Sequence, residues 1–403
     1  MSELTAAGAS AGGSAAAGSG ARTRRRRGGA VLDGPTLLLT SAIVLLGLIM
    51  VTSASITFAG RAGEPFAFLE RQLSLALGGC AAAVLTFLVP TEKWQKAALP
   101  LLLLAGVLLL LVLIPGIGHV VNGSRRWLRV AGLSFQVSEA ARVLALIYVA
   151  AYAVRYEEPL RQSAAALVRP LALLGLLALL LLLEPDFGAA SVLFVSGFAL
   201  LFLAGARLRF LLLMLLAAGG GMALLVRFSP YRLHRFMAFL NPWADPFNGG
   251  FQLTQSLIAI GRGAWFGVGL GASVQKLFYL PEAHTDFLFA VLAEELGLAG
   301  VAVTLALFLA LTWRAFVIAR RAFDVGLKFA SYLASGFGLW LGVQAFINIG
   351  VNMGVLPTKG LTLPFMSYGR SSLIVTLAWL GILLRVNHEA VQCSRRALRE
   401  SNA

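Results

Sequence analysis

The stretch VQKLFYLPEAHTDFLFAVLAEELG, from Val274 to Gly297, joins a polar segment directly to a long apolar one. Its polar part carries four ionisable side chains, Lys276, Glu282, His284 and Asp286. This order predicts a membrane helix with an ionisable cluster at its mouth. Because a charge at that depth is costly, such residues usually line a substrate path or a water-filled cavity. We therefore expect the chemistry of the protein here.

The composition of the chain is that of a membrane protein. Over 403 residues the mean hydropathy is +0.83, with 59% hydrophobic and 13% charged residues, which excludes an ordinary soluble domain. A membrane-spanning helix needs about 20 mostly apolar residues. The sequence predicts an all-α polytopic membrane protein with about ten transmembrane helices and a long extracytoplasmic loop, residues 227–285, between helices 7 and 8. The predicted spans are 36–59, 73–90, 98–117, 141–154, 170–184, 187–204, 209–226, 286–312, 329–354 and 371–385.

The distribution of Lys and Arg predicts the topology. Most of the 33 basic residues fall in segments that are cytoplasmic if the N-terminus is cytoplasmic. We expect residues 1–32 to form a disordered basic cytoplasmic tail, 33–387 a transmembrane domain, and 388–403 a cytoplasmic C-terminal tail. The loops 118–142 and 227–285 break the rule by carrying many basic residues outside, which indicates an anionic ligand there.

The net charge of +15 does not indicate a nucleic-acid partner. Anchoring of cytoplasmic basic residues to anionic lipid headgroups explains most of the excess. Cys80 lies within an apolar span and Cys393 in the C-terminal tail, so the two cysteines indicate neither a disulfide nor a metal site.

The acidic residues around the predicted eighth span have several interpretations. Asp286 is either a functional carboxylate or a helix N-terminal acid favoured by the macrodipole. An extended backbone would place Glu282, His284 and Asp286 on one face, where they form a weak candidate site for a divalent metal. Glu294 and Glu295 fall deeper in the span and must face protein or water. We interpret them as structural.

The first basic loop holds a second group of candidates. Arg125 and Arg126, beside a tryptophan, are either interfacial anchors or ligands of a diphosphate, which matches guanidinium geometry. Ser138 is the predicted N-cap of the fourth span. Glu139 and Arg142 are three residues apart, so we expect them to form an ion pair on one helix face.

Six blocks of sequence, in order between about residues 120 and 372, resemble one family. The chain is similar to the SEDS (shape, elongation, division and sporulation) family of bacterial cell-wall polymerases. The blocks are GSRRWL from Gly123, SFQVSEAAR from Ser134, EPDFG from Glu184, NPWADPFNGGFQLTQSLIAIGRG from Asn241, the stretch from Val274, and NIGVNMGVLPTKGLTLPFMSYGRSS from Asn348.

The resemblance implies a peptidoglycan glycosyltransferase that polymerises lipid II at the outer face of the cytoplasmic (inner) membrane. Such an enzyme joins the GlcNAc 4-hydroxyl of the acceptor to C1 of the donor MurNAc and expels undecaprenyl diphosphate. The essential aspartate of the family falls on Asp286, with the role of a general base. The implied substrate-binding residues are Arg125, Arg126, Glu139, Arg142, Lys276, His284, Lys359, Ser367 and Tyr368.

The resemblance also implies partners. The diphosphate charge has to be neutralised by basic residues or by a divalent cation, Mg²⁺ or Mn²⁺, and no organic cofactor is implied. The wording VNMGVLPTKGLTLPFMSYG is closer to the division branch of the family than to its elongation branch. Division-branch proteins act at the septum with a class B penicillin-binding protein, which supplies transpeptidation, and with other divisome membrane proteins.

Three positions depart from the family pattern, and two other functions stay open. Val137 replaces a proline, Arg142 a lysine and Arg370 a glycine, which would matter if that glycine required a positive φ. The alternatives are a lipid II flippase and a non-catalytic divisome scaffold. A transporter often has two similar halves, and this sequence has no such repeat. A scaffold predicts that Asp286 is replaceable.

Overall fold

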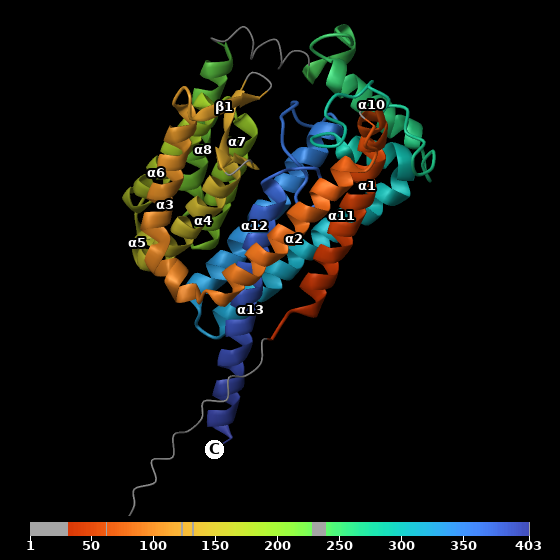
Figure 1. Cartoon of the computed structure of the whole chain (residues 1–403). Helices are drawn as coiled ribbons and strands as arrows, with labels where there is room; N and C mark the ends of the chain where they lie inside the picture. Colours follow the sequence, from red (N-terminus) through yellow and green to blue (C-terminus); the bar gives the residue numbers. More distant parts are fainter. Residues whose placement is uncertain (1–30, 62, 122–123, 131–132, 228–238, 403) are drawn as a thin grey trace, which may run out of the picture. The chain divides into compact units, whose positions relative to one another are not determined.

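The computed structural model describes residues 31–61, 63–121, 124–130, 133–227 and 239–402. The predicted basic tail up to residue 30 lies outside the described residues. Figure 1 shows long helices that run side by side, with a small sheet at one end. The helices are α1 Gly34–Arg61, α2 Ala67–Leu88, α3 Thr91–Leu113, α4 Val137–Arg155, α5 Glu157–Gln162, α6 Ala165–Leu183, α7 Phe187–Leu203, α8 Leu208–Arg227, the 3₁₀ helix η1 Pro242–Ala244, α10 Phe251–Gly263, α11 Leu288–Asp324, α12 Lys328–Asn352 and α13 Ser372–Ser401.

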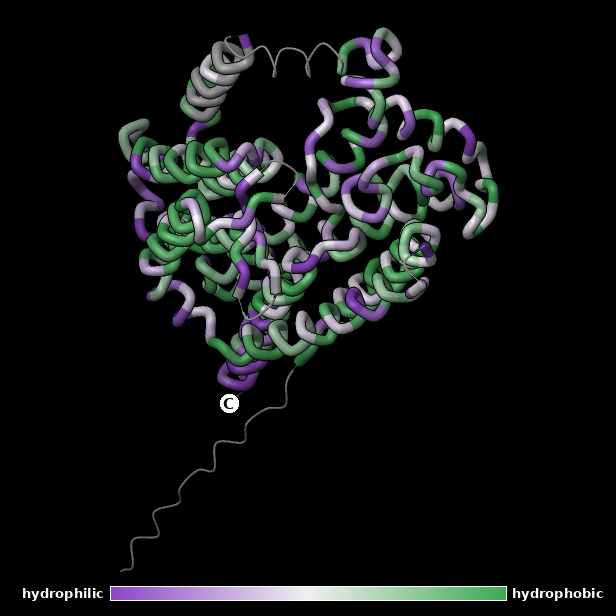
Figure 2. Tube along the Cα trace, turned by 45° about the horizontal axis from the view of Figure 1, so that its top comes forward, coloured by the Kyte–Doolittle hydropathy of each residue, from purple (hydrophilic) through white to green (hydrophobic). Residues whose placement is uncertain are grey.

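Long apolar helices dominate the described part of the chain. Eight of them are long and apolar enough to cross a membrane, namely α1, α2, α3, α4, α6, α11, α12 and α13. Helix α7 is a shorter apolar helix, and α8 coincides with the predicted span 209–226. Each predicted span therefore overlaps a helix, while the number that cross the membrane stays a prediction. Figure 2 shows hydrophobic residues along these helices and hydrophilic ones mainly in loops and near the C-terminal end.

Helices α4 and α12 are the most enclosed of these spans. In their most apolar windows, 78% of α4 and 72% of α12 residues are buried, against 11% of α2. Helix α12 packs against α4, α7, α11 and α13, so its polar side chains Gln344, Asn348 and Asn352 are buried inside the bundle. Buried amides require hydrogen-bond partners, and these three link α12 to the loops at one end.

A three-stranded antiparallel sheet occupies the first basic loop, where the sequence predicted only loop. Its strands are β1 Gly118–Val121, β2 Ser124–Val130 and β3 Leu133–Gln136, in the order β1-β2-β3. Trp127 is paired with His119 on one side and Gln136 on the other. Valines and aromatic residues favour this extended conformation.

Helix α4 follows β3 without a side-chain cap, so the predicted N-cap at Ser138 is wrong. The helix begins at Val137 and Gln136 takes the N-cap position. The Ser138 hydroxyl instead donates to Asp186 Oδ2 at 3.1 Å. The polar side chain therefore joins α4 to the start of α7 rather than closing its own helix.

Helix α11 is interrupted at Gly297, whereas the sequence predicted a single uninterrupted span over residues 286–312. Gly297 has φ 63° and ψ −162°, a conformation that favours glycine. A Cβ here would lie 2.3 Å from Gly267 N, because the chain after α10 crosses α11 at this point. Val268 N donates to Glu294 O at 3.0 Å, and Leu298 N donates to Ala264 O at 2.9 Å. The crossing chain thus accepts and supplies hydrogen bonds that the broken helix lacks.

Helix α13 continues to Ser401, with no break at the predicted domain boundary after residue 387. Its second half is tied to neighbouring elements. Val31 N donates to His388 Nδ1 at 2.9 Å, and Thr91 N at the start of α3 donates to Glu389 Oε1 at 3.1 Å. The predicted C-terminal tail is therefore a helical extension of α13.

Close packing of α2 against α13 at Gly381 gives a first prediction. A Cβ at Gly381 would lie 2.1 Å from Ala83 O and 2.2 Å from Thr86 Oγ1. We expect Gly381→Ala to reduce the free energy of unfolding by about 1–3 kcal/mol, because overpacking forces the helices apart. Gly78→Ala is the matched control, since its Cβ would meet only Ile374 Cδ1 at 3.9 Å. Thermal unfolding in detergent checks this, and equal midpoints for both variants would contradict it.

Candidate functional site

Segments far apart in the sequence meet at one end of the helices, where the sheet, the chain before α11 and the chain before α13 lie (Figure 1). Tyr368 N donates to His284 O at 3.0 Å. Gln136 N donates to Ser371 Oγ at 2.9 Å. We take this end, around Asp286, as the candidate functional site.

Two asparagines of α12 hold the backbone of Asp286. The Nδ2 atoms of Asn348 and Asn352 donate to Asp286 O at 2.9 and 3.1 Å. Asn348 Nδ2 also donates to Leu361 O at 2.5 Å, and Asn352 Oδ1 accepts from Ala290 N at 3.2 Å. The pair therefore positions the start of α11 and the loop before α13 together. Sequence reasoning missed these residues, although their spacing of four on a helix was a usable signal.

The Asp286 carboxyl lies in a crowded, weakly solvated position. A Cβ on Gly360 would be 3.0 Å from Asp286 Oδ2, a tight contact that the carboxyl would have to relieve by shifting. Burial, together with the nearby charges of Glu282 and Asp186, raises the pKa of Asp286 to about 7, while Arg126 opposes the shift. A carboxyl with this pKa exchanges a proton near neutral pH, which suits a general base.

Strand β2 carries Arg126 toward the turn between α6 and α7. Arg126 Nε donates to Glu184 O at 3.2 Å, and its Nη2 donates to Pro185 O at 3.3 Å. The predicted neighbour Arg125 points elsewhere, since its Nη1 donates to Leu113 O at the end of α3 at 3.0 Å. Of the two arginines, Arg126 is the one whose charge acts on Asp286.

The turn between α6 and α7 adds two acids that sequence reasoning did not select. Asp186 caps α7 by accepting from Ala189 N at 3.0 Å. Glu184 is fully buried, and neither of its carboxyl oxygens has a hydrogen-bond partner among the described residues. Burial, with Asp186 beside it, raises the pKa of Glu184 to about 8, so the group is mostly protonated at neutral pH. The EPDFG block was the available signal.

Lys359, from the loop before α13, faces the same turn. Its Nζ lies 5.4 Å from the centre of the Phe187 ring, within cation–π range. Burial lowers the pKa of Lys359, whereas the Asp186 charge raises it. Lys359 and Arg126 therefore both contact the segment that joins α6 to α7.

The ion pair predicted between Glu139 and Arg142 is confirmed. Arg142 Nη2 contacts Glu139, and the two side chains are 0% and 4% exposed. Arg142 Nη1 also donates to Gln344 Oε1 at 2.8 Å, and Gln344 Nε2 donates to Thr362 O at 3.0 Å. The pair thus connects α4 through α12 to the loop before α13. The charges of Arg142 and Glu139 therefore neutralise each other, as burial requires.

His284 belongs to an aromatic cluster. Its ring lies 4.9 Å from that of Phe68 and 5.7 Å from that of Tyr368, with Phe58 beside them at 6.4 Å. Burial lowers the pKa of His284, so the imidazole is mostly neutral at neutral pH. Ser367 Oγ accepts from Leu363 N at 2.9 Å. These predicted residues hold the two loops of the site against α1 and α2.

The backbone before α11 does not support the predicted metal site. Glu282 has φ 57°, and Thr285 N donates to Glu282 O at 3.1 Å, so the chain turns instead of extending. The extended conformation expected for Glu282, His284 and Asp286 is therefore wrong. Within the described ranges no group of three His, Cys, Asp or Glu is arranged to hold a metal ion.

The departures from the family pattern fit the fold without strain. Val137 is fully buried at the start of α4. Arg370 is exposed, and its Nη1 donates to Ser134 Oγ at 3.3 Å. Among the described residues with positive φ, neither Gly369 nor Arg370 occurs, so an arginine is accommodated in this loop.

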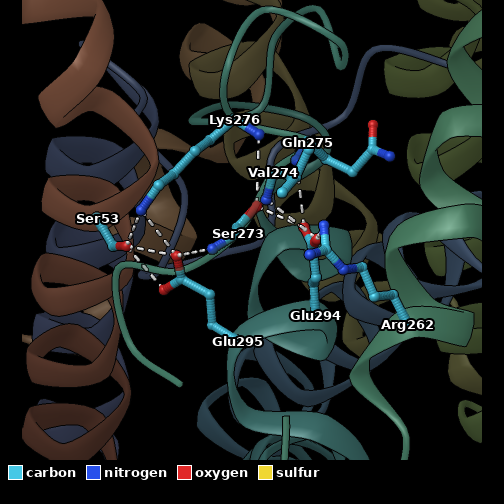
Figure 3. A network of polar contacts seen from close by, with 8 residues as sticks. All are labelled: Ser53, Arg262, Ser273, Val274, Gln275, Lys276, Glu294 and Glu295. Carbon is cyan, nitrogen blue, oxygen red and sulfur yellow. Dashed lines mark hydrogen bonds and ion pairs between the residues drawn. The ribbon is translucent and has the colours of Figure 1, made fainter. Parts of the chain in front are cut away.

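Behind the site, a buried polar network fixes the chain between α10 and α11 (Figure 3). Glu294 accepts from Ser273 Oγ at 2.5 Å, from Val274 N at 3.1 Å and from Arg262 Nη1 at 3.3 Å. Both glutamates are fully buried. The contacts support the structural interpretation of Glu294.

Glu295 links the same segment to α1. Its Oε1 accepts from Lys276 Nζ at 3.0 Å and from Ser53 Oγ at 2.7 Å (Figure 3). Lys276 Nζ also donates to Ser53 Oγ at 3.1 Å. The charge of Lys276 is thus matched by a carboxylate, which gives this predicted substrate ligand a structural partner.

Comparison with known proteins places the chain in a family. The sequence model of a family of cell cycle proteins, that of FtsW, RodA and SpoVE, matches residues 35–392. The chain belongs to this family, as the six sequence blocks predicted. A protein of Thioalkalivibrio sulfidiphilus named probable peptidoglycan glycosyltransferase FtsW is 56% identical over 352 residues, 87% of this chain and 88% of that protein. One of the same name from Coxiella burnetii is 50% identical over 358 residues, 89% and 96% of the two chains.

Solved structures have the same fold. One, described as showing the structural coordination of polymerization and crosslinking by a peptidoglycan synthase complex, has a TM-score of 0.71 at 33% identity and covers 90% of this chain and 99% of that one. The rod shape determining protein RodA of Thermus thermophilus has a TM-score of 0.66 at 31% identity, with 89% and 97% covered. The identity with FtsW proteins exceeds that with this RodA, in agreement with the predicted division branch.

The pairing of Lys276 with Glu295 gives a second prediction. Lys276→Met should reduce the free energy of unfolding by about 3–5 kcal/mol, because it leaves Glu295 buried without its cation. The double variant Lys276→Met/Glu295→Met should regain most of that loss, since two apolar groups replace the pair. Chemical unfolding in detergent measures both.

The control is Lys93→Met, at an exposed position in the first turn of α3. Unchanged stability of Lys276→Met, together with weaker substrate binding, would instead return Lys276 to the set of substrate ligands.

Proposed function

We propose that this chain is a peptidoglycan glycosyltransferase that polymerises lipid II into glycan strands during cell division. The family, and the names of relatives about half identical over nearly their whole length, support the reaction class. The observation that carries the mechanism is Asp286, held by two asparagines at the start of α11, with a carboxyl whose pKa is raised to about 7.

In the proposed reaction Asp286 acts as the general base. Its carboxylate accepts the proton of the acceptor GlcNAc 4-hydroxyl while that oxygen attacks C1 of the donor MurNAc. The bond between C1 and the diphosphate oxygen breaks, and its electron pair leaves with undecaprenyl diphosphate. The proton on Asp286 is then released to water, which regenerates the carboxylate.

The leaving diphosphate needs cationic groups near Asp286. Arg126 and Lys359 are our candidates, because both lie around the turn that carries Asp186, close to the proposed base. Arg142 is buried and engaged by Glu139, so we assign it a positioning role. Electrostatic stabilisation of developing charge is commonly a large part of catalysis.

We also propose the orientation and partners of the protein. We assign the end of α13 to the cytoplasm and the candidate site, at the other end, to the outer face; the exposed arginines at the end of α13 support this orientation. A class B penicillin-binding protein would crosslink the strands, and other divisome membrane proteins would recruit the pair to the septum. The similar solved chain from a complex for polymerization and crosslinking supports the first partner.

Replacement of Asp286 tests the proposal. Asp286→Asn and Asp286→Ala should lower the rate of lipid II polymerisation, assayed with the cognate penicillin-binding protein, by at least about 100-fold, the usual contribution of a general base. Glu64→Gln, an exposed acid in the turn between α1 and α2, should leave the rate unchanged. Normal thermal midpoints for all variants would exclude misfolding.

The outcomes distinguish the alternatives. Polymer formed at the wild-type rate by both Asp286 variants would remove this carboxylate from the mechanism. A wild-type protein that moves lipid II between leaflets but forms no polymer would establish a flippase. A protein that does neither, and still supports division with Asp286 replaced, would be a scaffold.

The raised pKa of Asp286 predicts a pH dependence. The deprotonated form is the base, so the polymerisation rate should rise as pH increases from about 6 to about 8. Glu282→Gln removes a negative charge that raises this pKa, so its profile should shift toward lower pH. Rates measured from pH 5.5 to 8.5 check both, and a flat profile or an upward shift in the variant would contradict them.

A further inference from the structure

A polar cavity lies far from the candidate site, among α3, α4 and α6. Its volume is about 600 Å³. The cavity is at the C-terminal end of α4, whereas Glu139 and Arg142 are near the N-terminal end. From Arg142 to Arg155 a helix rises about 20 Å. The polar lining includes Lys96, Tyr148, Tyr152, Arg155 and Arg169.

The cations of this cavity differ from others at the same end of the molecule. Arg161 and Lys328 both pair with Glu157, and Arg385 pairs with Glu389. In the described part of the chain, by contrast, no carboxylate forms an ion pair with Lys96, Arg155 or Arg169. Glu92 is the one acid in the lining, so the cavity keeps an excess of positive charge.

The wall behind these cations is built from three tyrosines of α4 and its end. The rings of Tyr152 and Tyr156 lie 4.5 Å apart, and the Arg155 guanidinium lies 5.7 Å from the centre of the Tyr156 ring. Tyr152 Oη donates to Ala166 O at 2.7 Å. The Arg169 charge acts on the Tyr148 hydroxyl. The tyrosines therefore form the wall and bring one hydroxyl near an arginine.

The apolar part of the lining, Ala98, Leu99 and Ala151, adjoins the outer surface of the helices. Leu99 lines the cavity and is 49% exposed. Val168, next to Arg169, is 53% exposed. In a membrane protein such side chains contact acyl chains. The cavity thus offers cations for a phosphate and, beside them, a lipid-facing surface.

We propose that this cavity binds the phosphodiester headgroup of an anionic phospholipid. Guanidinium groups match phosphate oxygens, and basic pockets between transmembrane helices are suited to such headgroups. The assignment to the cytoplasmic leaflet rests on the proposed orientation, but binding itself does not depend on catalysis. A bound headgroup would join α3, α4 and α6 and stabilise the folded chain by mass action.

The test uses the full-length protein in a neutral detergent. Native mass spectrometry with phosphatidylglycerol or phosphatidylcholine measures retained lipid, and thermal unfolding measures stabilisation. We expect phosphatidylglycerol, and not phosphatidylcholine, to bind and to raise the midpoint. Arg155→Gln/Arg169→Gln should weaken binding by about 25-fold, roughly fivefold for each arginine.

Two further variants control the result. Arg395→Gln/Arg396→Gln removes the same charge from the exposed end of α13 and should retain binding. Tyr148→Phe keeps the ring but removes the hydroxyl on which the Arg169 charge acts, and it should weaken binding less than the double arginine variant.

The proposal would be overturned by equal binding of the two lipids, or by full binding to the Arg155→Gln/Arg169→Gln variant. Inorganic phosphate or glycerol 3-phosphate serves as the soluble probe. Stabilisation by these anions without any by phosphatidylglycerol would also overturn it and assign the cavity to a free phosphate. None of these readouts depends on polymerisation, so failure here is separate from failure of the proposed reaction.

Discussion

The buried carboxylates of Glu294 and Glu295 are the interaction on which the site depends. Inside an apolar bundle an unpaired carboxylate is strongly unfavourable, so each of the two recruits donors from the chain after α10. Glu294 takes backbone and hydroxyl donors, and Glu295 takes Lys276 together with Ser53 of α1. These bonds fix the chain between α10 and α11, and thereby the stretch that leads to Asp286.

The acids of the candidate site are partnered differently from Glu294 and Glu295. Asp286 is anchored through its backbone carbonyl by Asn348 and Asn352, while its carboxyl forms no ion pair with any cation among the residues that the structure describes. Asp186 caps the start of α7. The carboxyl of Glu184 is buried and has no hydrogen-bond partner among the described residues. Asp186, like Glu294 and Glu295, therefore stabilises the fold, whereas Asp286 can exchange a proton.

The parts of the fold that the sequence predicted are those that depend on hydropathy alone. Each apolar run became a helix, and the spacing of Glu139 and Arg142 predicted their ion pair. The three-stranded sheet was missed, although Asn122-Gly123 is a dipeptide typical of hairpin turns. The break at Gly297 depends on the chain that crosses it, which no local pattern contains.

The candidate site was predicted only in part, because some of its residues are brought together by tertiary contacts that the sequence does not contain. Asp286 was identified from its block, but the clamp of Asn348 and Asn352 and the acids of the EPDFG turn depend on contacts between distant segments. Lys276 and Arg126 look equally basic in the sequence. Only tertiary packing pairs the first with Glu295 and brings the second near Asp286.

Helix α13 has a mechanical consequence. Its 30 residues extend about 45 Å, well beyond the roughly 30 Å of a hydrocarbon core. One end begins beside Ser371, which contacts the end of the sheet, and the other carries exposed arginines. A tilt of a few degrees about one end of a helix of this length displaces the other end by several ångströms. A displacement of the exposed C-terminal end is therefore coupled to the site through a single helix.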